Sequence, residues 1–288
     1  MRAKATVLGC YQVTGSWFTK EYPCSVYAYN CYRHGTVTPD EDSWKELDQS
    51  SLVYLAISHC SELKVPHRFQ SFSNLLGFQL HNTTIVEWKK ENSISATKHT
   101  KMAVLIISKT NMTRIPDGML EPLPKSLMDI EMTYTNLTSL PDDLHEKWHP
   151  LATVYLEHSL VTEFPEVLFA LQVTDVSLQG NLIERLPDLS DIHQYLYSFT
   201  VSDNPIVELP ETLGEGTVFT TFSAENTMIK TLPAWVHTNV ELATYLYGSP
   251  YCETQTGDVF DGAYLLCVER DSRIEGKCAI DIFDSRIP

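Results

Sequence analysis

Residues 173–187 read V-T-D-V-S-L-Q-G-N-L-I-E-R-L-P. Apolar residues Val173, Val176 and Leu178 come first, Asn181 follows them, and Pro187 ends the stretch. The spacing is L-x-x-L-x-L-x-x-N-x-L-x-x-L-P. It recurs from residue 51 to residue 250 in units of 22 to 27 residues. A period of this length predicts a stack of similar units that share one core.

Nine units align on the position of Asn181, and every residue at that position is small and polar or carries a thiol. We call this position the inward column; its members are Cys60, Thr83, Thr110, Thr135, Ser159, Asn181, Asn204, Thr227 and Ser249. Apolar residues occupy the positions three and five before it in almost every unit, and a proline follows later in most units.

The pattern resembles the leucine-rich repeat (LRR) family over about two-thirds of the chain. The resemblance implies an α/β solenoid, an LRR horseshoe with a parallel β-sheet on its concave face. In this family the inward column hydrogen-bonds the backbone where the chain turns off each strand. A buried amide left unpaired there would cost about 1–3 kcal/mol. The family also implies a binding scaffold, and therefore a non-enzymatic protein.

A stack of repeats exposes its core at both ends, so capping segments are expected. We assign residues 1–50 to an N-terminal cap rich in aromatic residues and cysteines, residues 51–250 to about nine repeats, and residues 251–288 to a C-terminal cysteine cap. Within the first cap, residues 38–47 are predicted to form a short helix. The flanks E-Y-P-C-S-V-Y-A-Y-N-C-Y and Y-G-S-P-Y-C look like those of the cysteine-capped LRR proteins of oomycetes.

The seven cysteines gather toward the two ends of the chain, which favours disulfide-bonded caps and an oxidising compartment. One disulfide is expected within Cys10, Cys24 and Cys31, and another within Cys252, Cys267 and Cys278. Cys60 is expected to be a buried small residue, with pairing to an N-terminal cysteine as the alternative. Because seven is odd, at least one thiol is free or bonds another chain.

Three N-x-S/T sequons make Asn82, Asn111 and Asn136 candidate glycosylation sites. With the cysteines, they predict an extracellular protein, or one associated with the extracellular side of a membrane. The first residues lack the apolar core of a signal peptide, so we expect that peptide to be missing from this chain. A cytoplasmic scaffold is the alternative. The sequence predicts no transmembrane segment, because no run approaches about 20 apolar residues.

The chain has 21 Lys and Arg residues against 37 Asp and Glu residues, a formal charge of −16. Such an acidic surface disfavours binding to nucleic acid or to anionic membranes, because phosphate recognition requires a basic face. The expected partner is therefore a protein or peptide ligand, possibly basic.

The concave face is the predicted contact surface, because alternate strand side chains project from it. Its middle combines carboxylates with aromatic residues that can anchor a partner. The candidate partner-binding residues are Asp129, Glu131, Thr133, Tyr134, Tyr155, Glu157, His158, Asp175, Ser177 and Gln179.

A competing hypothesis comes from H-E-K-W-H at residues 145–149, which has the spacing of a zinc metallopeptidase. On a helix, His145 and His149 would share zinc and Glu146 would act as general base. However, Pro150 disfavours a helical conformation at His149. The motif also falls on the convex side of a repeat, where no cleft is expected. We therefore predict no metal site, no cofactor and no catalytic residue, and keep a zinc hydrolase as the alternative function.

Overall fold

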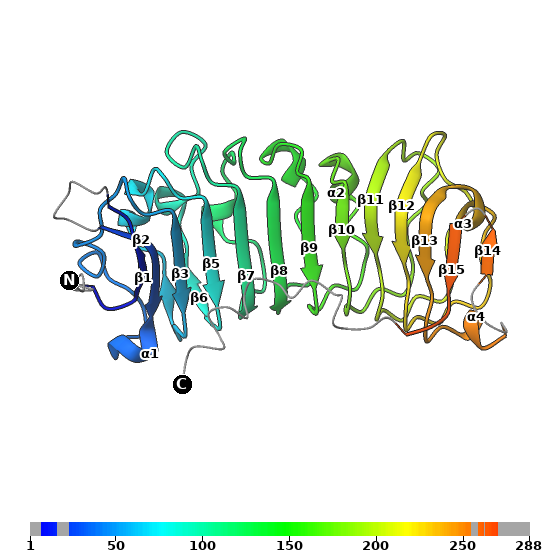
Figure 1. Ribbon diagram of the computed structural model, residues 1–288, viewed down its shortest axis with the longest axis horizontal. Helices are drawn as coiled ribbons and strands as arrows, with labels where there is room; N and C mark the ends of the chain where they lie inside the picture. The colour runs from blue at the N-terminus through cyan, green and yellow to red at the C-terminus, as the bar shows by residue number, and fades with distance from the viewer. Residues whose placement is uncertain (1–6, 16–22, 255–258, 262, 270–288) are drawn as a thin grey trace. The chain divides into compact units, whose positions relative to one another are not determined.

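The structure is a computed structural model that describes residues 7–15, 23–254, 259–261 and 263–269. It divides into two compact units, Met1–Val154 and Tyr155–Pro288. Each unit is a leucine-rich-repeat solenoid, in which the strands of successive repeats lie side by side (Figure 1). Among the described residues, no helix is long and apolar enough to cross a bilayer.

The sheet of the first unit has the order β1-β2-β3-β5-β7-β8, antiparallel for β1 with β2 and parallel for every later pair. A separate pair, β4 and β6, is also parallel. The elements of this unit are β1 (Cys10–Val13), β2 (Cys24–Asn30), α1 (Cys31–His34), β3 (Tyr54–Ser58), β4 (Leu63–Lys64), η1 (His67–Ser71), β5 (Gly77–His81), β6 (Ile85–Glu87), η2 (Lys90–Asn92), β7 (Val104–Thr110), η3 (Asp117–Met119), β8 (Asp129–Thr135) and η4 (Leu144–Glu146).

The sheet of the second unit has the order β10-β11-β12-β13-β15-β14, parallel except for the final pair. The division between the units falls within β9 (Thr153–Glu157). The remaining elements are α2 (Val167–Ala170), β10 (Asp175–Ser177), β11 (Tyr195–Thr200), β12 (Val218–Ser223), α3 (Trp235–Thr238), β13 (Val240–Tyr245), α4 (Pro250–Glu253), β14 (Val259–Asp261) and β15 (Ala263–Leu266).

Each of the nine predicted units contributes one strand, from β3 to β13, and the inward column lies inside the core. All nine of its residues are at most 6% exposed. Asn181 shows what the column does: its Nδ2 donates to Leu156 O at 2.7 Å and Leu178 O at 2.9 Å, and its Oδ1 accepts from Val161 N at 3.3 Å. Asn204 repeats this arrangement one unit later. The prediction that this column points inward is confirmed. Its side chains bond the backbone at Thr110, Thr135, Ser159, Asn181, Asn204 and Thr227, whereas Thr83 pairs with the Thr110 hydroxyl and the buried Ser249 hydroxyl has no partner among the described residues.

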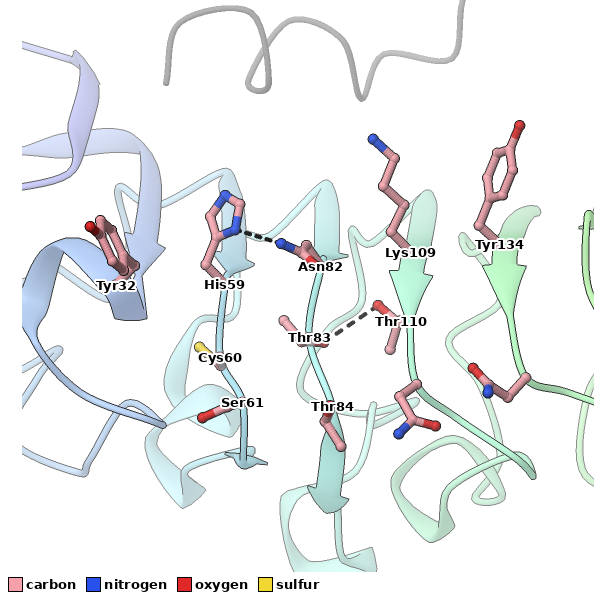
Figure 2. Close-up of a pocket in the computed structure, with 12 residues that line it drawn as sticks. Tyr32, His59, Cys60, Ser61, Asn82, Thr83, Thr84, Lys109, Thr110 and Tyr134 are labelled. Carbon is pink, nitrogen blue, oxygen red and sulfur yellow. Dashed lines mark hydrogen bonds between the residues drawn. The ribbon is translucent and has the colours of Figure 1, made fainter. Parts of the chain in front are cut away.

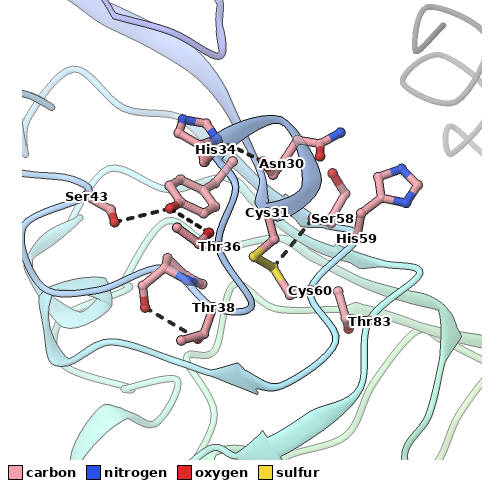
Figure 3. Close-up of a disulfide and its surroundings, with 12 residues drawn as sticks. Asn30, Cys31, His34, Thr36, Thr38, Ser43, Ser58, His59, Cys60 and Thr83 are labelled. Carbon is pink, nitrogen blue, oxygen red and sulfur yellow. Dashed lines mark hydrogen bonds between the residues drawn. A yellow bond between two sulfur atoms is a disulfide. The ribbon is translucent and has the colours of Figure 1, made fainter.

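Disulfides join residues at both ends of the described chain. The bonds are Cys10–Cys24, Cys31–Cys60 and Cys252–Cys267. One disulfide at each end was expected, and the structure confirms both. Cys60 takes the alternative role, since it bonds Cys31 at the start of α1 and ties this helix to the first repeat (Figure 3). Cys278 lies outside the described residues.

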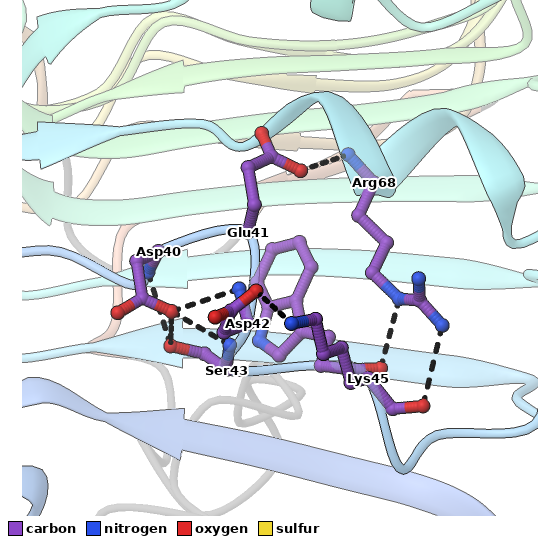
Figure 4. Close-up of polar contacts among 7 residues, drawn as sticks. Asp40, Glu41, Asp42, Ser43, Lys45 and Arg68 are labelled. Atoms are coloured by element: carbon purple, nitrogen blue, oxygen red, sulfur yellow. Dashed lines mark hydrogen bonds and ion pairs between the residues drawn. The ribbon is translucent and has the colours of Figure 1, made fainter.

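The prediction of a helix at residues 38–47 is wrong, because this segment forms successive turns. The Asp40 carboxylate accepts hydrogen bonds from the backbone N–H groups of Asp42 and Ser43, at 2.9 and 2.7 Å (Figure 4). The backbone bonds of the segment run from residue i to residue i+3, as for Lys45 N with Asp42 O and Leu47 N with Trp44 O, which makes turns instead of an α-helix. Trp44 is nevertheless fully buried, and the Glu41 carboxylate accepts from the Arg68 N–H in η1.

Replacing Asn181 with Ala is expected to lower the free energy of unfolding by about 3 kcal/mol. The substitution leaves the buried N–H of Val161 without its acceptor and removes one donor from Leu156 O and from Leu178 O, although Asn204 Nδ2 still donates to Leu178 O. Chemical denaturation of the intact chain would measure the change. Glu184→Ala, at an exposed position of the same repeat, should shift stability by less than about 0.5 kcal/mol. Equal effects of the two substitutions would contradict this role for the inward column.

Because the protein buries His99, we expect its free energy of unfolding to decrease in mild acid. His99 is fully buried; its Nδ1 accepts from Ser95 N at 3.0 Å and its Nε2 lies 3.2 Å from Phe69 O. Burial lowers the pKa of His99 from 6.5 to about 4. In the unfolded chain His99 therefore binds a proton as the pH falls through about 6.5, whereas in the folded chain it binds one only near pH 4. Stability contributed by neutral His99 is complete above pH 6.5 and falls by about 3 kcal/mol down to pH 4.

Denaturation between pH 7 and pH 4 would measure this slope. In His99→Gln, which has no titrating group at this position, the slope should be reduced. An unchanged slope would assign the acid sensitivity to other residues.

Candidate functional site

The exposed face of the parallel sheet, opposite the core, is the surface that the sequence predicts to be concave; we call it the sheet face. In the second unit it carries separate hydrogen-bonded contacts between side chains of neighbouring repeats. Tyr155 Oη donates to Asp175 Oδ2 at 3.1 Å, and Ser177 Oγ donates to Glu157 Oε1 at 2.5 Å. Five of the six predicted residues in this unit, Gln179 included, are thus held in neighbouring repeats; His158 is the sixth.

Gln179 forms a further contact with a residue outside the predicted set. Its Nε2 donates to Asp203 Oδ2 at 2.7 Å, and Asn226 Nδ2 donates to Asp203 Oδ1 at 2.8 Å. Burial raises the pKa of the Asp175 carboxyl, and hydrogen bonds from Tyr155 and Ser198 act in the opposite direction. The carboxylates of this face are therefore oriented by donors before any partner arrives, which lowers the entropic cost of binding.

The first unit holds the other four predicted residues, all on β8. Asp129, Glu131 and Thr133 project from alternate positions, in register with Val104, Ile106 and Ser108 of β7. Thr133 is largely buried, at 7% exposure. Tyr134 is 55% exposed, but its side chain points toward the edge of the sheet, because its backbone is left-handed, with a φ of 54°. It lines a groove there, instead of the sheet face.

Tyr134 belongs to a second recurring position, directly before the inward column, where the backbone is left-handed in all nine units. Its members are His59, Asn82, Lys109, Tyr134, His158, Gly180, Asp203, Asn226 and Gly248. His158 lies over Gly180, where an added Cβ would come within 2.2 Å of its Nδ1. The Gly, Asn and Asp residues in this column are a sequence signal for left-handed backbone, and could have identified Asp203 and Asn226.

The acidic charge of the chain is concentrated in its second half. Residues 155–269 contain 17 Asp and Glu residues against two cations, Arg185 and Lys230, whereas residues 1–154 contain 16 against 15. The formal charges are therefore −15 and −1. Arg185 lies with Glu208 away from the sheet face, at 3.7 Å in an exposed pair. The chemistry of the second unit is consequently that of an anionic surface that attracts cations.

The three sequon asparagines are all exposed, and all three line the same groove at the edge of the first unit. Asn82 is also hydrogen-bonded, with its Nδ2 2.7 Å from His59 Nδ1. Glycosylation of these residues stays a prediction.

The H-E-K-W-H segment does not form the helix that a zinc peptidase site requires. η4 is a single turn that ends at Glu146. His145 Nδ1 lies 3.1 Å from Asp142 O, and the two ring nitrogens of His149 face Pro150 O and Pro124 O at 2.7 and 2.9 Å. Trp148 points inward and donates to Met119 O at 2.7 Å. Among the residues that the structure describes, no cluster of three His, Cys, Asp or Glu side chains could hold a metal ion.

No protein-family model matches the chain, and no curated protein matches it. Solved structures that resemble it are leucine-rich-repeat proteins. The LRR domain of the type III effector XopL is 14% identical, with a TM-score of 0.49 and coverage of 71% of each chain. InlP of Listeria monocytogenes is 14% identical, with a TM-score of 0.49; 73% of this chain and 62% of InlP are covered.

An LRR protein of Leptospira interrogans is 15% identical, with a TM-score of 0.41 and coverage of 75% of this chain and 71% of its own. The fold assignment rests on the strand order and the inward column of this chain itself.

Proposed function

We propose that this protein is a non-enzymatic recognition module that binds a basic protein or peptide on the sheet face. The observation that carries the proposal is the pair of oriented carboxylates on this face of the second unit, where Glu157 and Asp175 accept hydrogen bonds from Ser177 and Tyr155 of neighbouring repeats. Asp203, at the edge of the sheet, accepts from Gln179. The charge of −15 over residues 155–269 would steer a cationic partner toward this unit.

Tyr155 supplies an aromatic surface next to these carboxylates, and its hydroxyl is already held by Asp175. Lys and Arg side chains combine a cationic head with an apolar stem, so a carboxylate beside an aromatic ring suits both parts. We propose that Asp129, Glu131 and Thr133 of the first unit contribute to the same function through their own part of the sheet face.

Removal of two charges from this face tests the proposal. The probe is a library of random twelve-residue peptides, selected on the intact immobilised chain. We expect the selected peptides to be rich in Lys and Arg, and Glu157→Gln with Asp175→Asn to weaken their binding at least about tenfold, because charge-assisted bonds contribute about 1.5–3 kcal/mol each. The weakening should shrink as salt is added.

Glu184→Gln with Glu208→Gln is the matched control, since it removes the same charge from exposed positions off the sheet face. Equal loss of binding in the control would show that overall charge, and not the sheet face, determines peptide binding. Selection of peptides without cationic residues would contradict a basic partner.

We further propose that the protein functions outside the cell or on the extracellular side of a membrane. Residues 1–50 and 251–288 would form the caps that cover the two ends of its repeats. The three disulfides support this proposal, because such bonds persist in oxidising compartments. The resemblance of the flanks to the cysteine-capped proteins of oomycetes belongs to the same proposal.

Peptide mapping without reduction, on protein from its natural source, is expected to recover linked peptides for Cys10–Cys24, Cys31–Cys60 and Cys252–Cys267. Six free thiols at these positions would instead favour the cytoplasmic alternative.

A further inference from the structure

A groove runs along the edge of the first unit at the carboxyl ends of β3, β5, β7 and β8 (Figure 2). Its volume is about 640 Å³. The inward residues Cys60, Thr83 and Thr110 form its floor, where the hydroxyl groups of the two threonines lie 3.4 Å apart. We call this feature the rim groove. It is a different surface from the sheet face to which the proposed function is assigned.

One side of the rim groove is a row of large side chains on left-handed backbone. His59, Asn82, Lys109 and Tyr134 have φ angles of 57°, 49°, 47° and 54°. Figure 2 shows His59, Lys109 and Tyr134 projecting to the same side. Left-handed backbone costs a non-glycine residue about 1–2 kcal/mol. Strain of this kind is a pointer to function when the side chains it carries line a cavity.

The other side of the groove is a row of amides and hydroxyls, which directly follows the inward column. Thr84 forms a parallel bridge with Asn111, and the register of Thr110 with Thr135 places Asn111 and Asn136 on adjacent repeats. Adjacent strands lie about 4.8 Å apart. This interval is close to the length that one pyranose residue adds to an extended glycan chain.

A tyrosine stands toward each end of the groove. Tyr32 is 85% exposed and Tyr134 is 55% exposed. Tyr32 lies in α1, which the Cys31–Cys60 disulfide fixes to the first repeat beside the groove floor (Figure 3). An exposed tyrosine offers a flat apolar ring together with a hydroxyl, which suits the C–H face of a sugar ring.

The lining also differs from the rest of the surface in its charge. None of the residues that line the rim groove, all of them described, is Asp or Glu, although the chain carries a formal charge of −16. Lys109 is the cation among them. Amides and hydroxyls both donate and accept hydrogen bonds, as sugar hydroxyls do.

We propose that the rim groove binds an oligosaccharide that runs across successive repeats, with about one sugar residue at each repeat. Asn82, Asn111 and Asn136 hydrogen-bond its hydroxyl groups, and Tyr32 and Tyr134 contact its ring faces. An N-glycan attached to any of these asparagines would itself occupy the groove, so the binding form is the chain with unmodified asparagines.

The intact chain, made in the bacterial periplasm so that disulfides form and N-glycans do not, would be titrated with pentamers of β-1,4-linked glucose, β-1,4-linked N-acetylglucosamine and α-1,4-linked galacturonate. We expect saturable binding of at least one pentamer. Asn111→Ala with Asn136→Ala should weaken it at least about tenfold, since two amide partners are lost. A preference for galacturonate that Lys109→Gln removes would identify an acidic sugar as the ligand. A preference for a neutral pentamer that Lys109→Gln leaves unchanged would identify a neutral one.

Tyr32→Ala should also weaken binding, and Tyr264→Ala, at an exposed tyrosine of the second unit, is its matched control. Thermal unfolding would verify that each variant is folded. The variant Glu157→Gln with Asp175→Asn should bind sugar normally, which separates this proposal from peptide binding on the sheet face. Absence of binding by all three pentamers, or unchanged binding by the Asn111 and Asn136 variant, would overturn the proposal.

Discussion

The structure depends on how the backbone N–H and C=O groups are hydrogen-bonded where the strand of each repeat ends. At that point the chain turns toward the core, and its amide groups leave the sheet ladder without reaching water. A left-handed residue makes the turn, and the next side chain bonds the buried backbone, as Asn181 does for Val161, Leu156 and Leu178. Buried polar groups that lack such partners are costly. This pair of positions therefore marks the carboxyl end of the strand in each of the nine repeats.

The sequence predicts this part of the fold well because the constraint acts on side-chain chemistry. A small polar or thiol residue is required at each inward position, so the column is visible from Cys60 to Ser249. Residues 38–47 are different, because their composition suits both a helix and a series of turns. The structure holds this segment in turns with i to i+3 backbone bonds, such as Lys45 N to Asp42 O, and composition does not distinguish these from the i to i+4 bonds of a helix.

The candidate sites were only partly predictable from the sequence, because their contacts depend on local backbone conformation. Alternation along a strand places Tyr155, Glu157 and Asp175 on one face, but it does not reveal which side chains bond each other across repeats. The contact of Gln179 with Asp203 depends on the left-handed conformation of Asp203, which turns this residue toward its neighbours. The bond of Cys31 to Cys60 likewise depends on α1 lying beside the first repeat. Such contacts are set by backbone direction at single residues.

The left-handed column also explains how one repeat pattern can carry two surfaces of different chemistry. After His158 in the second unit, this column contains Gly, Asp and Asn, the residue types that adopt the conformation at least cost. In the first unit it contains Asn82 together with His59, Lys109 and Tyr134. These last three adopt the conformation at greater cost than Gly, Asp or Asn, and all four line a groove without carboxylates. The turn itself needs none of these larger side chains. Their presence is best explained by what they contact beyond the turn, while the acidic residues that dominate 155–269 leave the sheet face of the second unit to a cationic partner.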